Sequence, residues 1–269
     1  KEFNLDTNSE VILGLPGETI EQHFDAIDAL LELDMDHILS YTLMMLNGTK
    51  LNTPEERTRW GYKTKYRVIP RDFSELSTGQ RIVEVEEVAV ESSAMSFNDY
   101  LDAREFVLML QVLNTRVTKI ILKYCMQCGV QGKDVIKELI ATLKSGESKD
   151  CSLGAVFEEY REKTESELFD TEEQLIQFFQ EDEAFAGLID GKYGSNLLQT
   201  YKAKILSTYI DELLELALDF LRSKGPSNVS AGNNDSDTAL ENVENFAIGM
   251  SAGFLDETRP DCDLEYRFE

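Results

Sequence analysis

The sequence predicts an α/β fold in which a strand–helix–strand unit is followed by a region built from helices. The unit is predicted by the stretch from Glu10 to Gln22, where an apolar run leads through a glycine-rich turn into a helix start. The helical region is predicted by apolar residues that recur at helical spacing from Ser96 onwards. A hydrophobic content of 42% over 269 residues indicates a core-forming chain of one large or two ordinary domains.

The first strand, 11–13, has no polar face, so we expect it to be buried on both sides. Gly14, Pro16 and Gly17 end it sharply. A strand that enters a helix through such a turn can offer free backbone amides to an anionic or polar ligand. The same turn also occurs purely as a connection, which is the commoner case for short glycine motifs.

The helix of this unit is expected to begin at Ile20 and end at Leu33, because Thr19 and Gln22 have the spacing of a capping box. A second apolar strand follows at 37–46 and closes at the turn 47–49. The two strands should be parallel, with a right-handed connection. Their carboxyl ends should then place the turns 14–19 and 47–49 side by side on one rim, where ligands collect in such folds.

Three segments carry a recognisable pattern: ILGLPGET at 12–19, YTLMMLNGT at 41–49 and SAMSFNDYL at 93–101. They resemble the radical S-adenosylmethionine (SAM) family, and most closely its subgroup that often carries an amino-terminal cobalamin-binding domain. The resemblance spans about residues 5–110. It implies that residues 1–95 form the second half of a radical SAM-type, TIM-like (βα) barrel and that 96–223 form an all-α domain. One departure is Asn47, where related proteins usually have Pro.

The resemblance also implies the chemistry: a reduced [4Fe-4S] cluster cleaves SAM, and the adenosyl radical removes a hydrogen atom from a small-molecule substrate. In the cobalamin subgroup, methyl transfer can follow. Backbone at 12–14 would meet the adenine, and 41–49 would line the adenosyl or ribose side. The residues implied for cofactor binding are Ile12, Leu13, Gly14, Leu15, Pro16, Gly17, Tyr41, Leu43, Asn47, Gly48 and Thr49. No catalytic acid or base is assigned.

The family's cluster-binding CxxxCxxC motif is absent from this sequence. Our interpretation is a carboxyl-terminal fragment of a longer enzyme, with the cluster held by the missing amino-terminal half. Such a piece would be inactive alone. It would also be marginally stable or self-associating, because half a barrel leaves strand edges unpaired.

The charge of −25 argues against nucleic-acid binding, which normally begins from a basic surface. No apolar run reaches membrane-spanning length and no signal peptide is recognised, so we expect no membrane partner. Four cysteines in such a chain suggest a reducing, cytoplasmic setting.

Cys125 and Cys128 form a CxxC pair that could bind metal or carry redox chemistry. Both share a helical stripe with apolar residues, no second CxxC exists, and His23 and His37 lie far upstream. Core packing is therefore the favoured interpretation, and no metal site is predicted.

The segment 50–81 is expected to be the least regular part of the first half. Within it, the run 57–71 holds six basic and no acidic residues, with aromatic residues interleaved. This run could receive an anionic substrate or cofactor group, or it could dock on the protein's own acidic surface. The candidate anion-binding residues are Arg59, Lys63, Lys65 and Arg67.

A strand is expected at 82–91, with a β-bulge at Glu86–Glu87 that would bring its four valines onto one face. Ser96 and Asp99 suggest the start of a helix at 97–114, which is broadly apolar and therefore expected to be buried. Helices are then expected around Cys125 to near Gly129, from a cap at Asp134 to 143, and at 153–163. A further helix should follow a capping box at Thr171, and one long helix should span 196–222. Residues 224–238 are interpreted as a flexible linker, with a last helix at 239–249 and a possible edge strand at 264–268 within 239–269.

Two other functions remain open. The chain could be a non-catalytic interaction or scaffold module whose helical region, 96–223, presents an acidic face to a partner. It could also be a nucleotide-binding α/β protein that uses the 14–19 turn for phosphate, although it lacks both the Walker lysine and the GxGxxG spacing.

Overall fold

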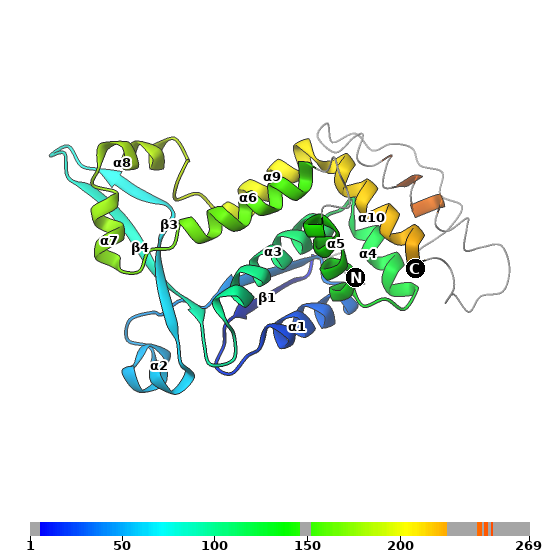
Figure 1. Ribbon diagram of the computed structural model, residues 1–269, viewed down its shortest axis with the longest axis horizontal. Helices are drawn as coiled ribbons and strands as arrows, with labels where there is room; N and C mark the ends of the chain where they lie inside the picture. Colours follow the sequence, from blue (N-terminus) through cyan, green and yellow to red (C-terminus); the bar gives the residue numbers. More distant parts are fainter. Residues whose placement is uncertain (1–5, 146–151, 225–240, 244, 247–248, 250–269) are drawn as a thin grey trace.

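A computed structural model describes residues 6–145, 152–224, 241–243, 245, 246 and 249. Strand β1 (Asn8–Leu13), helix α1 (Ile20–Glu32) and strand β2 (His37–Thr42) form the expected parallel βαβ unit (Figure 1). The register pairs Asn8 with His37 and Leu13 with Thr42. The capping box of Thr19 and Gln22 is formed, which confirms the helix start.

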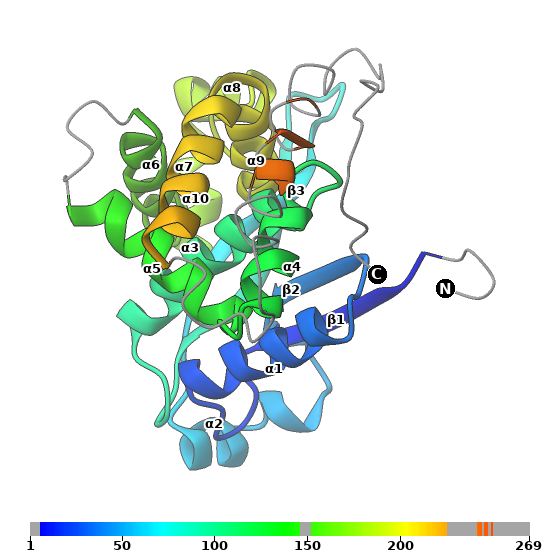
Figure 2. The ribbon, with the colours of Figure 1, turned by 90° about the vertical axis from the view of Figure 1, so that its right-hand side faces the viewer.

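Only one face of the β1–β2 pair is buried, so the expectation of burial on both faces was wrong. Leu13 and Ile38 join the main hydrophobic cluster, which also contains residues of α1 and of helix α3 (Phe97–Leu113). On the other face, Ile12 is 41% and Tyr41 is 50% exposed. Figure 2 shows the two strands at the margin of the helical body. The strands are apolar on both faces, but within the described residues helices cover only one of them.

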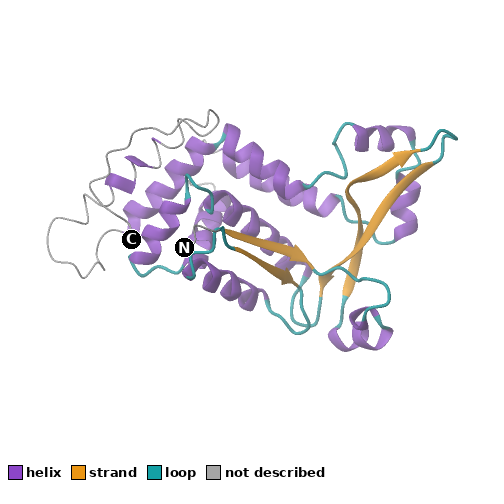
Figure 3. Cartoon of the chain, turned by 180° about the vertical axis from the view of Figure 1, so that it is seen from behind, coloured by secondary structure: helices purple, strands orange, loops and turns teal. Residues whose placement is uncertain are grey.

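The segment 50–81 is regular, contrary to expectation. A 3₁₀ turn (Lys50–Asn52) and helix α2 (Pro54–Trp60) lead into β3 (Lys63–Glu75), which pairs antiparallel with β4 (Arg81–Glu91). The residues after β2 also pair with β4, through the amide of Met45 and the carbonyl of Glu87 at 2.9 Å. This long hairpin extends away from the main body of helices, and short helices lie beside its outer part (Figure 3). The described strands form two two-stranded sheets and no closed barrel.

The predicted bulge at Glu86–Glu87 is wrong, because these residues pair regularly with Arg67 and Tyr66. The register shifts instead between Val68 and Phe73 and between Lys63 and Thr64. The four valines need not lie on one face, because two of them pack in one hydrophobic cluster and two in another. Val83 and Val85 pack against a small cluster with helices α7 (Glu172–Phe178) and α8 (Asp182–Ile189), and Val88 and Val90 join the main one.

The remaining helices pack into one body. They are α3 (Phe97–Leu113), α4 (Lys119–Gln127), α5 (Gly132–Ser145), α6 (Ser152–Ser166), α9 (Leu197–Thr208) and α10 (Ile210–Lys224). As expected, α3 begins with a capping box at Ser96 and is largely buried. One hydrophobic cluster includes residues of β1, α1, α3 and α10, so the described residues on both sides of position 95 share a core.

Two helix predictions need correction. Asp134 lies inside the first turn of α5, and the cap comes from another helix: Asp28 of α1 accepts a hydrogen bond from the Lys133 amide at 2.9 Å. The single helix expected at 196–222 is broken at Tyr209, between α9 and α10. Thr208, Tyr209 and Ile210 are branched or aromatic residues, which have reduced helix propensity.

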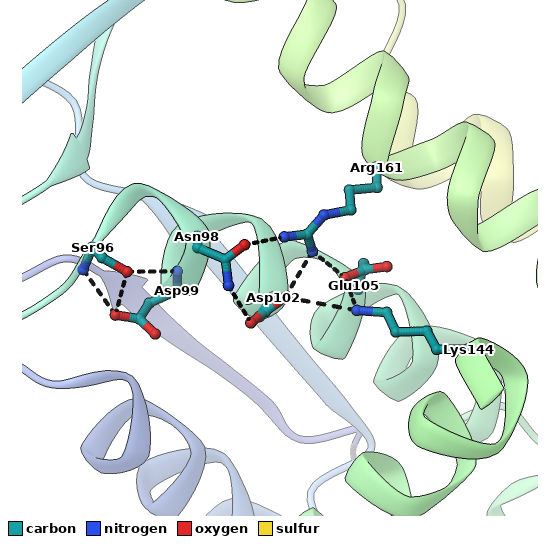
Figure 4. Close-up of polar contacts among 7 residues, drawn as sticks. All are labelled: Ser96, Asn98, Asp99, Asp102, Glu105, Lys144 and Arg161. Atoms are coloured by element: carbon teal, nitrogen blue, oxygen red, sulfur yellow. Dashed lines mark hydrogen bonds and ion pairs between the residues drawn. The ribbon is translucent and has the colours of Figure 1, made fainter.

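An ion-pair network fastens α3 to α5 and α6 (Figure 4). The Arg161 guanidinium donates to Asp102 at 2.7 Å, to Glu105 at 2.5 Å and to Asn98 at 2.6 Å. Lys144 donates to Glu105 at 2.7 Å. The side chain of Glu105 is almost fully buried, and two cations compensate its charge.

The expected linker at 224–238 and edge strand at 264–268 fall outside the described residues, apart from residue 224. Of the helix expected at 239–249, residues 241–243, 245, 246 and 249 are described, and these are helical. Among the described residues, no helix has the length and apolar character needed to cross a membrane.

Candidate functional site

The turn between β1 and α1 is held by Glu18. Gly14 and Gly17 adopt φ angles of 91° and 77°, which favour glycine. One oxygen of the Glu18 carboxylate accepts the amides of Gly14 at 2.9 Å and Leu15 at 3.1 Å. Burial raises the pKa of this carboxyl, but its bonds to His23 and to the two amides outweigh burial, so the pKa is lowered.

These bonds change the interpretation of the turn. Its first two amides are occupied by a carboxylate of the same turn, so they are not free for an anionic ligand, and the negative charge of Glu18 would repel one. A phosphate site built on the 14–19 turn is therefore disfavoured.

Side chains from three elements fix the turn. Buried His23 lies between Glu18 and Ser40, with Nδ1 3.2 Å from the Glu18 carboxylate and Nε2 3.0 Å from the Ser40 hydroxyl. The Tyr62 hydroxyl donates to the Gly14 carbonyl at 3.0 Å. Burial, with Glu18 and Glu56 nearby, raises the pKa of Tyr62 to about 12, so the phenol keeps its proton.

The carboxyl ends of β1 and β2 lie together, as predicted. The Leu43 amide donates to the Leu13 carbonyl at 3.0 Å, and a Cβ on Gly14 would lie 3.8 Å from the Leu43 Cβ. Leu13 and Leu43 turn their side chains into the core. The Leu13 carbonyl is occupied by the Leu43 amide, and the Leu43 carbonyl accepts the Ala89 amide at 2.9 Å, so these backbone groups are not free for a ligand. The side chains of Ile12 and Tyr41, which are register partners, are exposed on the open face. Leu15 is also exposed, whereas Pro16 is half-buried.

The turn 47–49 is closed by its own contacts. The Thr49 hydroxyl donates to the Leu46 carbonyl at 2.8 Å, and the Asn47 side chain accepts from Asn52 at 3.3 Å. Gly48 has a φ of 80° and is open to solvent. Within the described part of the chain, no hydrogen bond joins this turn to residues 14–19, so their closeness stays a prediction.

Each of the four basic candidates is paired with an acidic group of this chain. Lys63 lies 2.5 Å from Glu91, Arg67 lies 2.5 Å from Glu86, and Lys65 pairs with Asp170. The Arg59 guanidinium lies 3.5 Å from Glu56 and 4.8 Å from the centre of the Trp60 ring. These pairs favour docking on the protein's own acidic surface over a shared anion site.

The cysteine pair lies where core packing was expected. Cys125 is buried in the main cluster, Cys128 packs against it, and burial raises the pKa of the Cys125 thiol to about 12. A thiol with so high a pKa is a poor nucleophile and metal ligand. Across the described ranges, no three His, Cys, Asp or Glu side chains are placed to hold a metal ion.

Sequence reasoning missed one group of polar residues: Thr42, Arg104 and Glu167 line the same cavity. The available signal was a single arginine, Arg104, in the middle of a helix expected to be buried. Its surroundings could not be read from the sequence, because they come from segments far away along the chain.

The chain resembles two curated proteins over 114 residues. These are the cobalamin-dependent radical SAM methyltransferase TokK of Streptomyces tokunonensis and the 2-(S-pantetheinyl)-carbapenam-3-carboxylate methyltransferase of Streptantibioticus cattleyicolor. Each is 32% identical over 41% of this chain, and the match covers 16% of each relative's length. No protein-family model matches. The similarity supports a distant relationship to radical SAM methyltransferases.

Proposed function

We propose that this chain forms the adenosyl and substrate side of a radical SAM enzyme. In this proposal, residues 1–95 are the second half of a (βα) barrel and 96–223 a helical domain beside it. The observation that carries the proposal is the apolar, exposed face at the carboxyl ends of β1 and β2, where Ile12 and Tyr41 lie opposite each other. The distant similarity to radical SAM methyltransferases supports it.

The surface fits a nucleoside in two respects. The exposed side chains of Ile12 and Tyr41 offer an apolar and an aromatic surface on which adenine can stack. In addition, β1 pairs only with β2 among the described strands, so its other edge carries N–H and C=O groups without a strand partner. These groups suit the hydrogen-bonding edge of adenine. Glu18 and Tyr62 would hold the turn rigid beside it.

The cluster itself would be held outside this sequence, because none of its four cysteines lies in a CxxxCxxC motif. When bound and reduced, a [4Fe-4S] cluster supplies the electron that cleaves SAM. This chain would bind and orient the adenosyl group through the backbone of Ile12 at the open edge of β1 and through the Tyr41 ring. They would also keep water from that side of the reaction.

Binding of SAM to the full 269-residue chain, measured by isothermal titration calorimetry, tests the proposal. Tyr41→Ala should weaken binding about 5- to 100-fold, the loss expected when a base loses one aromatic stacking partner. Ile189→Ala, another exposed apolar residue but on α8, is the control and should leave affinity unchanged. Equal affinity of the Tyr41→Ala variant and the unmodified chain would overturn the proposal.

A further inference from the structure

A polar cavity of about 190 Å³ lies where β2, β3, α3, α6 and the start of α9 meet. Its wall includes residues 39–42 of β2 and residues 195–199. Charged side chains enter it from three elements: Arg67 from β3, Arg104 from α3 and Glu167 just after α6. Five segments therefore converge on one small space.

Buried polar atoms without a hydrogen-bond partner gather at this cavity. In the wall itself they are the Thr42 hydroxyl, Nε of Arg104 and one oxygen of Glu167. Thr42 is only 6% exposed. Buried polar groups are normally hydrogen-bonded, so this concentration indicates a space made to receive a polar ligand or ordered water.

Arg104 differs from the other guanidinium groups nearby. Arg67 pairs with Glu86, and Arg161 pairs with Asp102 and Glu105. In the described residues, Arg104 forms no ion pair, and its Nε has no hydrogen-bond partner. Burial lowers its pKa, while nearby Tyr160, Tyr100 and Glu86 raise it, with a net increase, so it stays charged. A buried cation without a counter-ion is unfavourable unless a ligand supplies the missing anion.

The start of helix α9 adds a second attraction for an anion. Asn196 caps the helix by accepting the Gln199 amide at 3.2 Å, and residues 196–199 line the cavity. The first amides of a helix have no intrahelical acceptor, and the helix dipole makes this end positive. The cavity is thus locally positive in a chain whose net charge is −25.

A second, apolar cavity of about 310 Å³ adjoins the first, and the two share Val68 and Glu167 in their walls. Aromatic side chains line much of the second cavity: Phe169, Phe178, Phe179 and Tyr193. The pair offers a positive polar compartment beside an aromatic one. This arrangement suits a small molecule with an anionic group at one end and an apolar body.

We propose that these joined cavities bind such a molecule, with its carboxylate or phosphate group on Arg104 and the start of α9. Its apolar part lies among the aromatic side chains between α6, α7 and residue 193. The Thr42 hydroxyl adds a hydrogen bond to the anionic group. This site is argued from its own contacts and holds whether or not the chain binds SAM.

Calorimetric titration of the full chain with three matched probes tests this proposal. Two carry an anionic group on an aromatic body, 4-phenylbutyrate and phenyl phosphate, and 4-phenylbutanol is the neutral match. At least one anion should bind saturably, and the alcohol should bind about tenfold more weakly or not at all. The tighter of the two anions identifies the preferred group. No saturable binding by either anion, or equal binding of the alcohol, would mean that the cavity holds only water and would overturn the proposal.

Arg104→Met removes the charge and keeps most of the side-chain volume. It should weaken anion binding about tenfold or more, since hydrogen bonds to a charged group are lost. Arg161→Met is the matched control, because Arg161 also faces α3 but is fully paired (Figure 4); it should leave anion binding within about twofold. Unchanged binding in Arg104→Met would contradict the assignment.

Thermal unfolding of the ligand-free chain gives an independent readout. Arg104→Met should lower the melting temperature less than Arg161→Met does, because Arg104 has no carboxylate within ion-pair distance in the described residues. Arg161→Met should lower it, because it breaks the network around Glu105. If Arg104→Met fails to fold, Thr42→Val serves in its place and should weaken anion binding about threefold through one lost hydrogen bond. Unchanged binding in this variant would equally contradict the assignment.

Discussion

Replacing Glu167 by Gln should stabilise the protein at alkaline pH and have little effect at acidic pH. The Glu167 carboxyl is half-buried between the two cavities, and one of its oxygens has no hydrogen-bond partner in the described structure. Burial raises its pKa from 4.5 to about 7, although Lys163 and Arg67 act in the opposite direction. The folded protein therefore disfavours the ionised carboxylate.

The sign follows from proton linkage. Because the pKa is higher in the folded state, the folded protein binds more protons than the unfolded chain between pH 4.5 and about 7. The contribution of Glu167 to the free energy of unfolding is thus most favourable below pH 4.5 and is lost as the pH rises through about 7. At about 1.36 kcal/mol per pKa unit the full shift gives an upper bound of about 3 kcal/mol. Partial solvent screening reduces the expected loss to about 1–2 kcal/mol.

Urea unfolding at pH 5 and pH 8 measures this difference. The free energy of unfolding of Glu167→Gln, relative to the unmodified chain, should rise by about 1–2 kcal/mol between the two pH values, because glutamine cannot ionise. Glu165→Gln, an exposed site on α6, is the control and should show no such rise. If the difference in free energy of unfolding between Glu167→Gln and the unmodified chain is the same at pH 5 and pH 8, burial does not disfavour the ionised Glu167.

Two further predictions concern stability. Asp28→Ala should lower the free energy of unfolding by about 1–2 kcal/mol, because Asp28 caps α5 through the Lys133 amide. Asp134→Ala should lower it by less than about 0.5 kcal/mol. Equal losses of the two variants in chemical denaturation would contradict this prediction. The pKa of Glu87 is lowered: burial raises it, but the bonds from Arg57 and Thr64 outweigh burial. The ionised Glu87 therefore stabilises the fold above pH 4.5, and this contribution is lost as the pH falls through the lower pKa of the folded state. In Glu87→Gln the free energy of unfolding should decline less between pH 6 and pH 3 than in the unmodified chain. An equal decline in the two proteins would refute this prediction.

Local signals predicted the helix starts well. The capping boxes at Thr19 and Ser96 place α1 and α3 where the side-chain spacing requires. Such boxes depend on residues three apart, so the sequence contains all the information needed. The parallel βαβ unit followed in the same way from strand and helix lengths.

Structural features that depend on partners distant in the sequence could not be predicted. The four valines of β4 suggested a bulge, but they face two different clusters, and the smaller one forms only when α7 and α8 fold back. The true cap of α5 is Asp28, which lies more than 100 residues away from Lys133. For the basic run 57–71 the sequence left two interpretations open, an anion site and docking on the protein's own acidic surface. It could not decide between them, because the acidic partners of Arg57, Lys63 and Lys65 come from β4 and from Asp170. Arg104 stood out in the sequence as an arginine within a helix expected to be buried, but the cavity around it is formed by residues of β2, β3 and α9 that are distant in the sequence.

The most direct test of the proposed adenosyl surface is an NMR titration of the ¹⁵N-labelled chain with SAM. If this surface binds the adenosyl group, the amide signals of Ile12, Gly14 and Tyr41 shift together along one saturation curve, while those of Ile189 and its neighbours on α8 stay in place. Absence of saturable shifts, or shifts confined to other parts of the chain, would contradict it.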